Sequence, residues 1–365
     1  MVNKAAMRAH NGLLGDCCEG FRGRRNMSAQ RQVWQDRAKG IGIALVVFGH
    51  VIRGLTGAHI APESAAIQTI DYTLYLFHMP LFFLLAGLNV ERSARKGAAP
   101  FLRDKLHTIV WPYFFWSIAQ GLVLVRMSGN LNIPVTYGDL ARILWAPISQ
   151  FWFLYALMVC HLVYVALGGR QRLLAPIAVI GFALSPFAPF LPAKILFNLG
   201  FYVVGLLVAP VLADWLERRA SATMLALVAF AFAVLTFAGV RSGLAFDNPL
   251  SLPAAIAGIG LTLIIAKMLA GVAGKVAETV GRMSMTIYIL HLFAAGGARV
   301  LMQKIGVAPN VALYATVITF IGIAAPMVAH IAFERLGLLA WLGLAAPKRA
   351  PVRPSSAGVV VSARS

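Results

Sequence analysis

Long apolar runs alternate with short polar segments along most of this 365-residue chain. A helix rises about 1.5 Å per residue and the hydrocarbon layer of a bilayer is about 30 Å thick, so runs of about 20 residues can cross it. The ten apolar runs of suitable length are 40–56, 70–90, 107–126, 143–167, 173–190, 195–213, 222–240, 251–270, 284–303 and 309–333. The pattern predicts an all-α polytopic membrane protein with about ten transmembrane helices, and the lipid bilayer is its expected surrounding.

Composition supports a membrane protein over a soluble one. Hydrophobic residues make up 59% of the chain, charged residues 12%, and the mean hydropathy is +0.77. Soluble domains carry about 25% charged residues, roughly twice this fraction. We predict a transmembrane domain over residues 36–335, a basic flexible N-terminal extension over residues 1–35 and a disordered C-terminal tail over residues 346–365.

The net charge of +19 indicates membrane orientation, not nucleic-acid binding. The basic residues lie between apolar runs, and no RNA- or DNA-binding signature is present. With a cytoplasmic N terminus, 25 of the 32 Lys and Arg fall in cytoplasmic segments and 7 in outer ones. Cytoplasmic loops of membrane proteins are enriched in Lys and Arg. We therefore expect both termini in the cytoplasm and a multi-pass protein in a plasma membrane of the bacterial inner-membrane type.

The first apolar run carries the most informative histidine. It reads Asp36-Arg-Ala-Lys-Gly-Ile-Gly-Ile-Ala-Leu-Val-Val-Phe-Gly-His50. His50 lies eleven residues after Lys39, about 16 Å further along a helix and on the same face, and Asp36 shares that face. An ionisable side chain near the middle of a bilayer predicts a functional site. The alternative is a histidine that only hydrogen-bonds a neighbouring helix.

Other intramembrane histidines need separate consideration. His78 follows Asp71 by seven residues and shares its helix face, and Pro80 leaves the carbonyl of Leu76 without its usual donor. The second run crosses in the opposite direction, so His78 and His50 can line one cavity. A structural histidine beside a proline kink explains the pattern equally well. The histidines within predicted spans are His50, His78, His161, His291 and His330.

Basic residues cluster at the expected cytoplasmic end of the third run. Arg103 and Lys105 precede Trp111-Pro112-Tyr113, and Arg37 and Lys39 begin the first run. Together the four predict a basic rim suited to a polyphosphate ligand. Ordinary enrichment of Lys and Arg at the cytoplasmic face explains them as well.

The ninth run carries a polar stripe, and several well-known catalytic motifs are missing. Ser284, Tyr288 and His291 share one helix face, a pattern that usually joins helices within membranes. The sequence contains no P-loop, no HExxH and no GxSxG motif. We expect no metal cofactor and no nucleic-acid partner.

Several segments, taken in order, resemble acyltransferase family 3, in particular its fucose O-acetylase-like and polysaccharide O-acetyltransferase branch. The resemblance covers nearly all of residues 34–335. Its segments are Asp36-x-x-Lys39 through His50, Phe77-His-Met-Pro80 through Gly87, Arg103-x-Lys105 before Trp111-Pro112-Tyr113, Phe151-Trp152-Phe153-Leu154 and Ser284-Met-Thr-Ile-Tyr288-x-x-His291.

The resemblance implies transfer of an acyl group, commonly acetyl from acetyl-CoA, onto a hydroxyl of a glycan or glycolipid. It implies an essential role for His50, either as general base or as a covalent acyl carrier. Many members carry arginine where this chain has Lys39, and the two side chains do not bind phosphate equivalently. The family's basic cluster maps to Arg103 and Lys105.

We assign the remaining candidates from position and chemistry. Arg37, Lys39, Arg103 and Lys105 are expected to hold the CoA phosphates. Asp36 is expected to orient Lys39 or Arg37, and His78 to assist His50. Tyr288 and His291 are expected to position substrate. The rival function is a proton-coupled transporter or glycolipid flippase, which would also use intramembrane His and Asp, but the sequence shows no clear inverted repeat.

Overall fold

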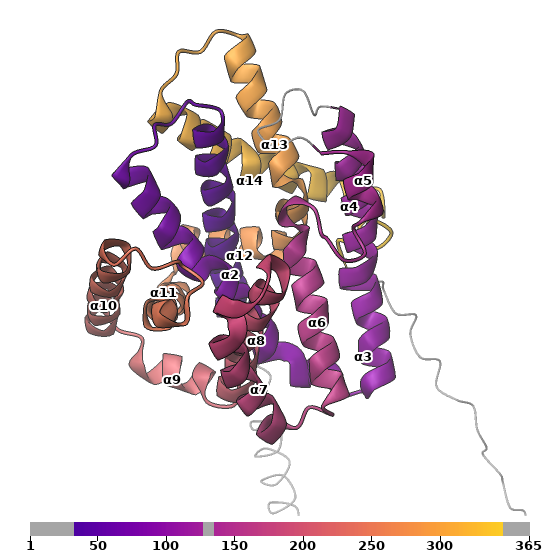
Figure 1. Cartoon of the computed structure of the whole chain (residues 1–365), viewed down its shortest axis with the longest axis vertical. Coiled ribbons are helices and arrows are strands. Elements are labelled where there is room, and N and C mark those ends of the chain that lie inside the picture. The colour runs from indigo at the N-terminus through magenta and orange to yellow at the C-terminus, as the bar shows by residue number, and fades with distance from the viewer. Residues whose placement is uncertain (1–32, 127–134, 346–365) are drawn as a thin grey trace, which may run out of the picture.

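The computed structural model describes residues 33–126 and 135–345, and every regular element in these ranges is a helix. The predicted tail 346–365 and all but the last three residues of the predicted extension 1–35 lie outside the described residues. Figure 1 shows the helices packed as one bundle. Nine helices in the described ranges are long and apolar enough to cross a membrane: Val33–Gly57, Ala65–Ala94, Ala98–Arg126, Ser149–Ala166, Phe190–Val208, Ala222–Arg241, Pro249–Met268, Ser284–Lys304 and Val311–Arg335.

These spans confirm the predicted all-α polytopic membrane fold. The predicted fifth span corresponds to a shorter apolar helix, α7 (Gln171–Leu184), which a 3₁₀ turn extends to Phe187. A π-helical turn, Leu106–Val110, joins α3 (Ala98–Lys105) to α4 (Trp111–Arg126) within one long span. Turns of this kind are often found at functional sites.

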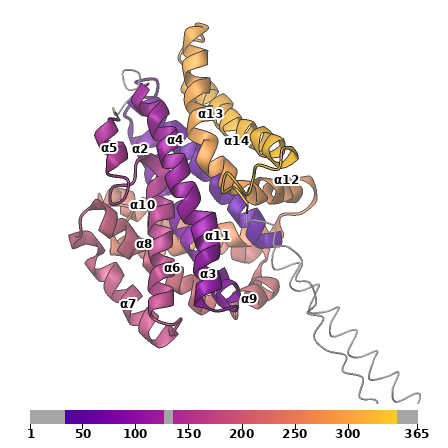
Figure 2. The ribbon, with the colours of Figure 1, turned by 90° about the vertical axis from the view of Figure 1, so that its right-hand side faces the viewer.

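The first helix, Val33–Gly57, and α2 (Ala65–Ala94) lie near the middle of the bundle (Figure 1). α2 packs against α8 (Phe190–Val208) and α11 (Leu252–Met268). In Figure 1, α10 (Ala222–Arg241) lies at the left edge, and α3 and α4 lie at the right. Figure 2 shows α13 (Ser284–Lys304) and α14 (Val311–Arg335) as an adjacent pair beside α12 (Gly271–Arg282).

Local sequence explains where several helices begin. The side chains of Ser64, Ser221 and Asn310 cap the N termini of α2, α10 and α14, each accepting a hydrogen bond from a backbone N–H three residues later. These amide groups have no partner within their own helix, so a capping oxygen stabilises the first turn. The short polar segments that separate the apolar runs therefore also determine the starts of these helices.

Contacts between helix ends identify the two ends of the bundle. At one end, Asn89 of α2 donates to Gln35 of the first helix at 3.0 Å, and Arg37 donates to the carbonyl of Leu269, after α11, at 2.5 Å. We call this the Asp36 end. At the opposite end, Arg53 pairs with Asp71, across the connection from the first helix to α2. We call this the Arg53 end. The cytoplasmic location of the Asp36 end remains a prediction from the Lys and Arg distribution.

Glycines permit the closest helix crossings. A Cβ at Gly87 would fall on the backbone of Tyr202, and a Cβ at Gly205 would fall on the backbone of Leu84. The backbones of α2 and α8 therefore touch at this crossing, which no larger residue would allow. Small residues commonly serve this purpose between membrane helices. The consequence is that α2, which carries His78, is held at a well-defined position in the bundle.

Candidate active site

His50 lies on the first helix with one ring nitrogen already engaged. Its Nδ1 is 2.8 Å from the carbonyl oxygen of Val46, one turn earlier, and the side chain is half-buried. A carbonyl oxygen can only accept, so Nδ1 carries the proton in the neutral ring and Nε2 keeps its lone pair. No hydrogen bond to Nε2 is present among the described residues. His50 thus presents a basic nitrogen within the bundle.

One further histidine, His291, contacts His50 directly, and a second, His78, is linked to it through Tyr75. The ring of His291, from α13, has its centroid 5.0 Å from that of His50. The ring of Tyr75, from α2, is 6.1 Å from His50 and 4.6 Å from His78. We call His50, His78 and His291 the histidine cluster. Its members come from three helices, and Tyr75 lies next to both His50 and His78. That His50 and His78 line one cavity stays a prediction.

All three histidines of the cluster have the same hydrogen-bonding arrangement. His78 Nδ1 is 2.5 Å from the carbonyl of Leu74, and His291 Nδ1 is 2.8 Å from the carbonyl of Tyr288. Both side chains are fully buried, and the Nε2 atom of each has no hydrogen-bond partner among the described residues. Leaving a buried polar atom unpaired costs free energy, about 1–3 kcal/mol per group. Two such atoms on rings that border His50 and Tyr75 indicate a site built to receive a ligand or a proton.

The other two histidines within predicted spans are paired with side chains. His161 Nδ1 is 2.8 Å from the hydroxyl of Tyr202, and His330 Nδ1 is 2.7 Å from the hydroxyl of Thr286. Both contacts join different helices. They match the structural use of histidine in membranes, which distinguishes them from the histidine cluster.

Tyr288 is held by a network that connects three parts of the chain. Its hydroxyl donates to the backbone oxygen of Gln150 at 2.5 Å. The side-chain amides of Gln150 and Gln120 exchange two hydrogen bonds, at 2.8 and 3.0 Å. The hydroxyl of Tyr288 is therefore already engaged, and this network fixes α13 against α4 and the start of α6 (Trp152–Ala166). His291, one turn further along α13, is thereby held near His50.

Tyr75 contacts the cluster, Arg53 lies against Tyr75, and Asp71 pairs with Arg53; no role was predicted for Arg53 or Tyr75. Arg53 makes a bidentate ion pair with Asp71, at 2.6 and 2.8 Å, and its guanidinium carbon lies 3.2 Å from the centroid of the Tyr75 ring. A signal was present in the sequence. Arg53 follows His50 by three residues, and Asp71, Tyr75 and His78 recur on one face of α2.

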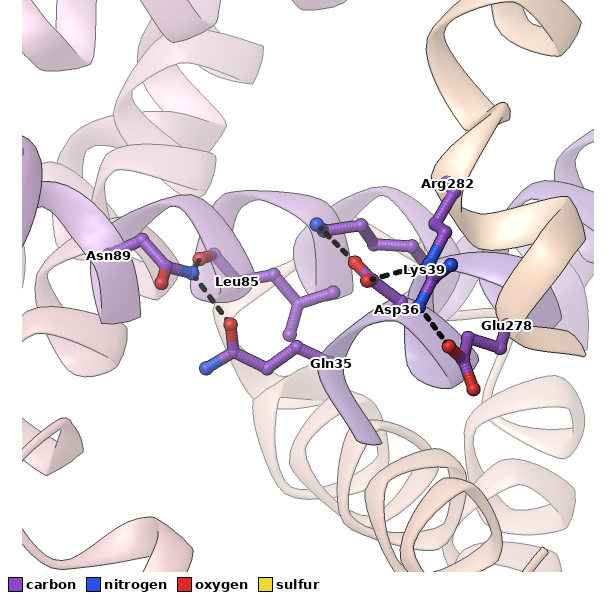
Figure 3. Close-up of polar contacts among 7 residues, drawn as sticks. All are labelled: Gln35, Asp36, Lys39, Leu85, Asn89, Glu278 and Arg282. Carbon is purple, nitrogen blue, oxygen red and sulfur yellow. Dashed lines mark hydrogen bonds and ion pairs between the residues drawn. The ribbon is translucent and has the colours of Figure 1, made fainter. Parts of the chain in front are cut away.

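Asp36 forms a charge network at the far end of the same helix (Figure 3). It pairs with Lys39 at 3.0 Å and approaches Arg282 of α12 at 3.8 Å, while Arg282 also pairs with Glu278. Fourteen residues separate Asp36 from His50 on one unbroken helix, a distance of about 21 Å. Asp36 is thus placed to position Lys39 and Arg282, and it does not reach the atoms near His50.

The four residues of the predicted basic rim come from two helices, the first helix and α3. Arg37 is directed to the carbonyl of Leu269, and the 35%-exposed Lys39 side chain pairs with Asp36. On α3, Lys105 lies 5.2 Å from the ring of Phe101, and Arg103 is exposed. No hydrogen bond joins the two pairs in the part of the chain that the structure describes. Lys39, Arg103 and Lys105 remain candidates for phosphate binding, whereas Arg37 is engaged with the backbone.

Comparisons with known proteins identify the family. The model of the acyltransferase domain of family 3 matches residues 32–331, and this range includes the histidine cluster, Arg53, Asp71 and Tyr75. Comparison with curated proteins gave no match. Comparison with solved structures gave none either. The narrower resemblance to the fucose O-acetylase-like branch stays a prediction. Because the family model covers most of the chain, this protein belongs to acyltransferase family 3 and is a membrane acyltransferase.

Proposed function

We propose that the protein transfers an acyl group from acyl-CoA to a hydroxyl of a glycan or glycolipid, with acetyl as the proposed group and His50 as general base. The observation that carries the proposal is the state of His50: Nδ1 is tied to the carbonyl of Val46, which leaves the Nε2 lone pair available within the bundle. An imidazole can accept a proton near neutral pH. General-base catalysis of this kind contributes about 10²–10⁴-fold to a rate.

The proposed step balances as follows. His50 Nε2 removes the proton from the acceptor hydroxyl while its oxygen attacks the thioester carbonyl carbon of acyl-CoA. A C–O bond forms, the C–S bond breaks, and the CoA thiolate leaves and takes up the proton from the imidazolium. The products are the O-acylated acceptor and free CoA. His291 and His78 flank the reacting region, and their unpaired Nε2 atoms can accept hydrogen bonds from the acceptor.

The charge distribution supports entry of the donor from the Asp36 end. CoA carries several negative charges. Lys39 lies near the start of the first helix, and Arg103 and Lys105 lie near the start of the span formed by α3 and α4; both spans enter the bundle from that end. His50 is about 16 Å beyond Lys39 along the first helix, so the long pantetheine arm would have to reach into the bundle. This arrangement keeps the phosphates near water and brings the thioester to the histidine cluster.

The test compares O-acyl groups on cell-surface glycans in a strain lacking the gene and in strains complemented with wild type, His50→Ala or His59→Asn. His59 is an exposed histidine with φ of 56°, and asparagine tolerates this conformation, so it is the matched control. We expect an O-acyl group that disappears with the gene, returns with wild type and His59→Asn, and falls at least about 100-fold with His50→Ala.

The same proteins, purified, are incubated with acetyl-CoA labelled in the acetyl group. Donor binding by wild type supports the proposal. A wild-type protein that neither binds acetyl-CoA nor changes any O-acyl group would favour the transporter or flippase. Normal O-acylation by a well-expressed His50→Ala protein would refute the assignment of His50.

A further inference from the structure

We propose that a cavity at the Arg53 end binds the neutral sugar portion of the acceptor, and that the Tyr75 ring, covered by the Arg53–Asp71 pair, forms the partition between this cavity and the histidine cluster. The inference rests on the proposed function, because it names where the acceptor of that reaction binds. It adds a binding site and a role for residues that lie outside the predicted catalytic set.

The cavity has a volume of about 530 Å³. It lies where the first helix ends and α2 begins, beside Phe246 in the connection between α10 and α11. Sites for small ligands commonly have volumes of about 300–1,000 Å³. The space is therefore adequate for one or two sugar units and is located at the opposite end of the bundle from the basic residues proposed for CoA.

The lining fits a polyhydroxylated, uncharged ligand. Glu63 and Asp71 supply carboxylate acceptors, Gln68 supplies an amide, and Tyr72 and Phe246 supply aromatic rings. Sugars present hydroxyl groups at their edges and C–H groups at their faces, which match polar and aromatic side chains respectively. Arg53 is the only basic residue of the lining, and Asp71 already neutralises it. The remaining carboxylate, Glu63, disfavours a phosphate or another anion.

The wall of the cavity is continuous with the histidine cluster. Arg53 contributes to the lining, and its guanidinium carbon lies 3.2 Å from the centroid of the Tyr75 ring. The Tyr75 ring in turn contacts both His78 and His50. One aromatic ring therefore stands between a ligand in the cavity and the proposed general base. The bidentate geometry of the Arg53–Asp71 pair gives this stack a defined orientation.

The Tyr75 hydroxyl is a buried hydrogen-bonding group at this boundary. Its charged neighbour among the described residues is the Arg53 guanidinium, which can only donate, so the hydroxyl hydrogen has no acceptor there. Nearby, the Tyr72 hydroxyl is engaged with Ser251 at 3.2 Å, so the two tyrosines differ in this respect. A sugar hydroxyl that passes Tyr75 toward His50 can satisfy this group, which assigns Tyr75 a positioning role for the acceptor.

The experiment fills the cavity without altering the histidine cluster. Gln68→Trp places a large side chain in the lining, and Ala66→Trp places the same side chain at an exposed position of α2 outside the lining. Glu63→Ala is a second variant, in an exposed loop, that removes an acceptor without adding volume. Each is measured for abundance, for binding of labelled acetyl-CoA and for O-acylation of surface glycans in the complemented deletion strain.

We expect Gln68→Trp to lower glycan O-acylation at least about tenfold and Glu63→Ala at least about fivefold, with donor binding within about twofold of wild type. Ala66→Trp should acylate as wild type does. Wild-type acylation by both lining variants, or an equal loss of donor binding in both, would overturn the cavity proposal while leaving the proposed function intact. If the wild-type gene adds no O-acyl group at all, the proposed function itself fails.

Discussion

The reciprocal amide pair between Gln120 and Gln150 permits a sharp test of how the candidate site is held together. Both side chains are buried, 1% and 3% exposed, and they exchange two hydrogen bonds, at 3.0 and 2.8 Å. Methionine has nearly the shape of glutamine and a similar helix propensity. We consider Gln120→Met, Gln150→Met and the double variant.

Each single substitution leaves one buried amide with its N–H and its carbonyl unpaired. At about 1–3 kcal/mol per orphaned group, the single variants should lose about 2–6 kcal/mol of folding free energy. Interhelical hydrogen bonds in membranes are worth less, about 0.6 kcal/mol each on average, which sets a lower value near 1 kcal/mol. The double variant has no orphaned amide, and replacing both partners with apolar groups of the same shape is nearly neutral.

The measurement is a double-mutant cycle of thermal stability in detergent, with glycan O-acylation as a second readout. We expect the double variant to be more stable than either single variant and to recover most of its activity, because Gln150 keeps the backbone oxygen that binds Tyr288. A double variant destabilised by the sum of the two single effects would refute the reasoning. It would show that shape at this position, and not hydrogen bonding, fixes α13 against α4.

Two further predictions concern the helix crossing and the charge network. Gly205→Ala should destabilise the protein by about 1–3 kcal/mol in the same melting assay, because its Cβ meets the carbonyl of Leu84. The control is Gly260→Ala, whose Cβ has no neighbour closer than 3.8 Å and which should be neutral or slightly stabilising; equal effects of the two substitutions would contradict the close crossing. Asp36→Asn should lower the folding free energy by about 0.2–1 kcal/mol and raise the KM for acetyl-CoA. Its kcat should fall less than tenfold because Asp36 lies far from His50, and a kcat loss as large as that of His50→Ala would show that Asp36 acts on the reacting atoms.

Hydropathy and helical periodicity were sufficient to predict the polytopic helical fold and to single out His50 as a candidate. Apolar runs must span the bilayer as helices because backbone groups find no partner in lipid, so the approximate limits of most spans can be read from the chain. The predicted fifth span is the exception, because it corresponds to the shorter helix α7. The same periodicity places Asp36, Lys39 and His50 on one face and identifies the 71, 75, 78 stripe of α2. The family followed from the order of these segments and was confirmed.

Periodicity specifies which residues share a face of one helix, but not which faces of different helices meet. The approach of His291 to His50, the Arg53–Asp71 pair over Tyr75 and the bond from Arg37 to the carbonyl of Leu269 all depend on how helices cross. Those crossings are determined by contacts between distant segments, such as the backbone contact at Gly87 and Gly205. The sequence alone therefore determined the spans and singled out His50 as the candidate, and only packing decided which side chains surround it.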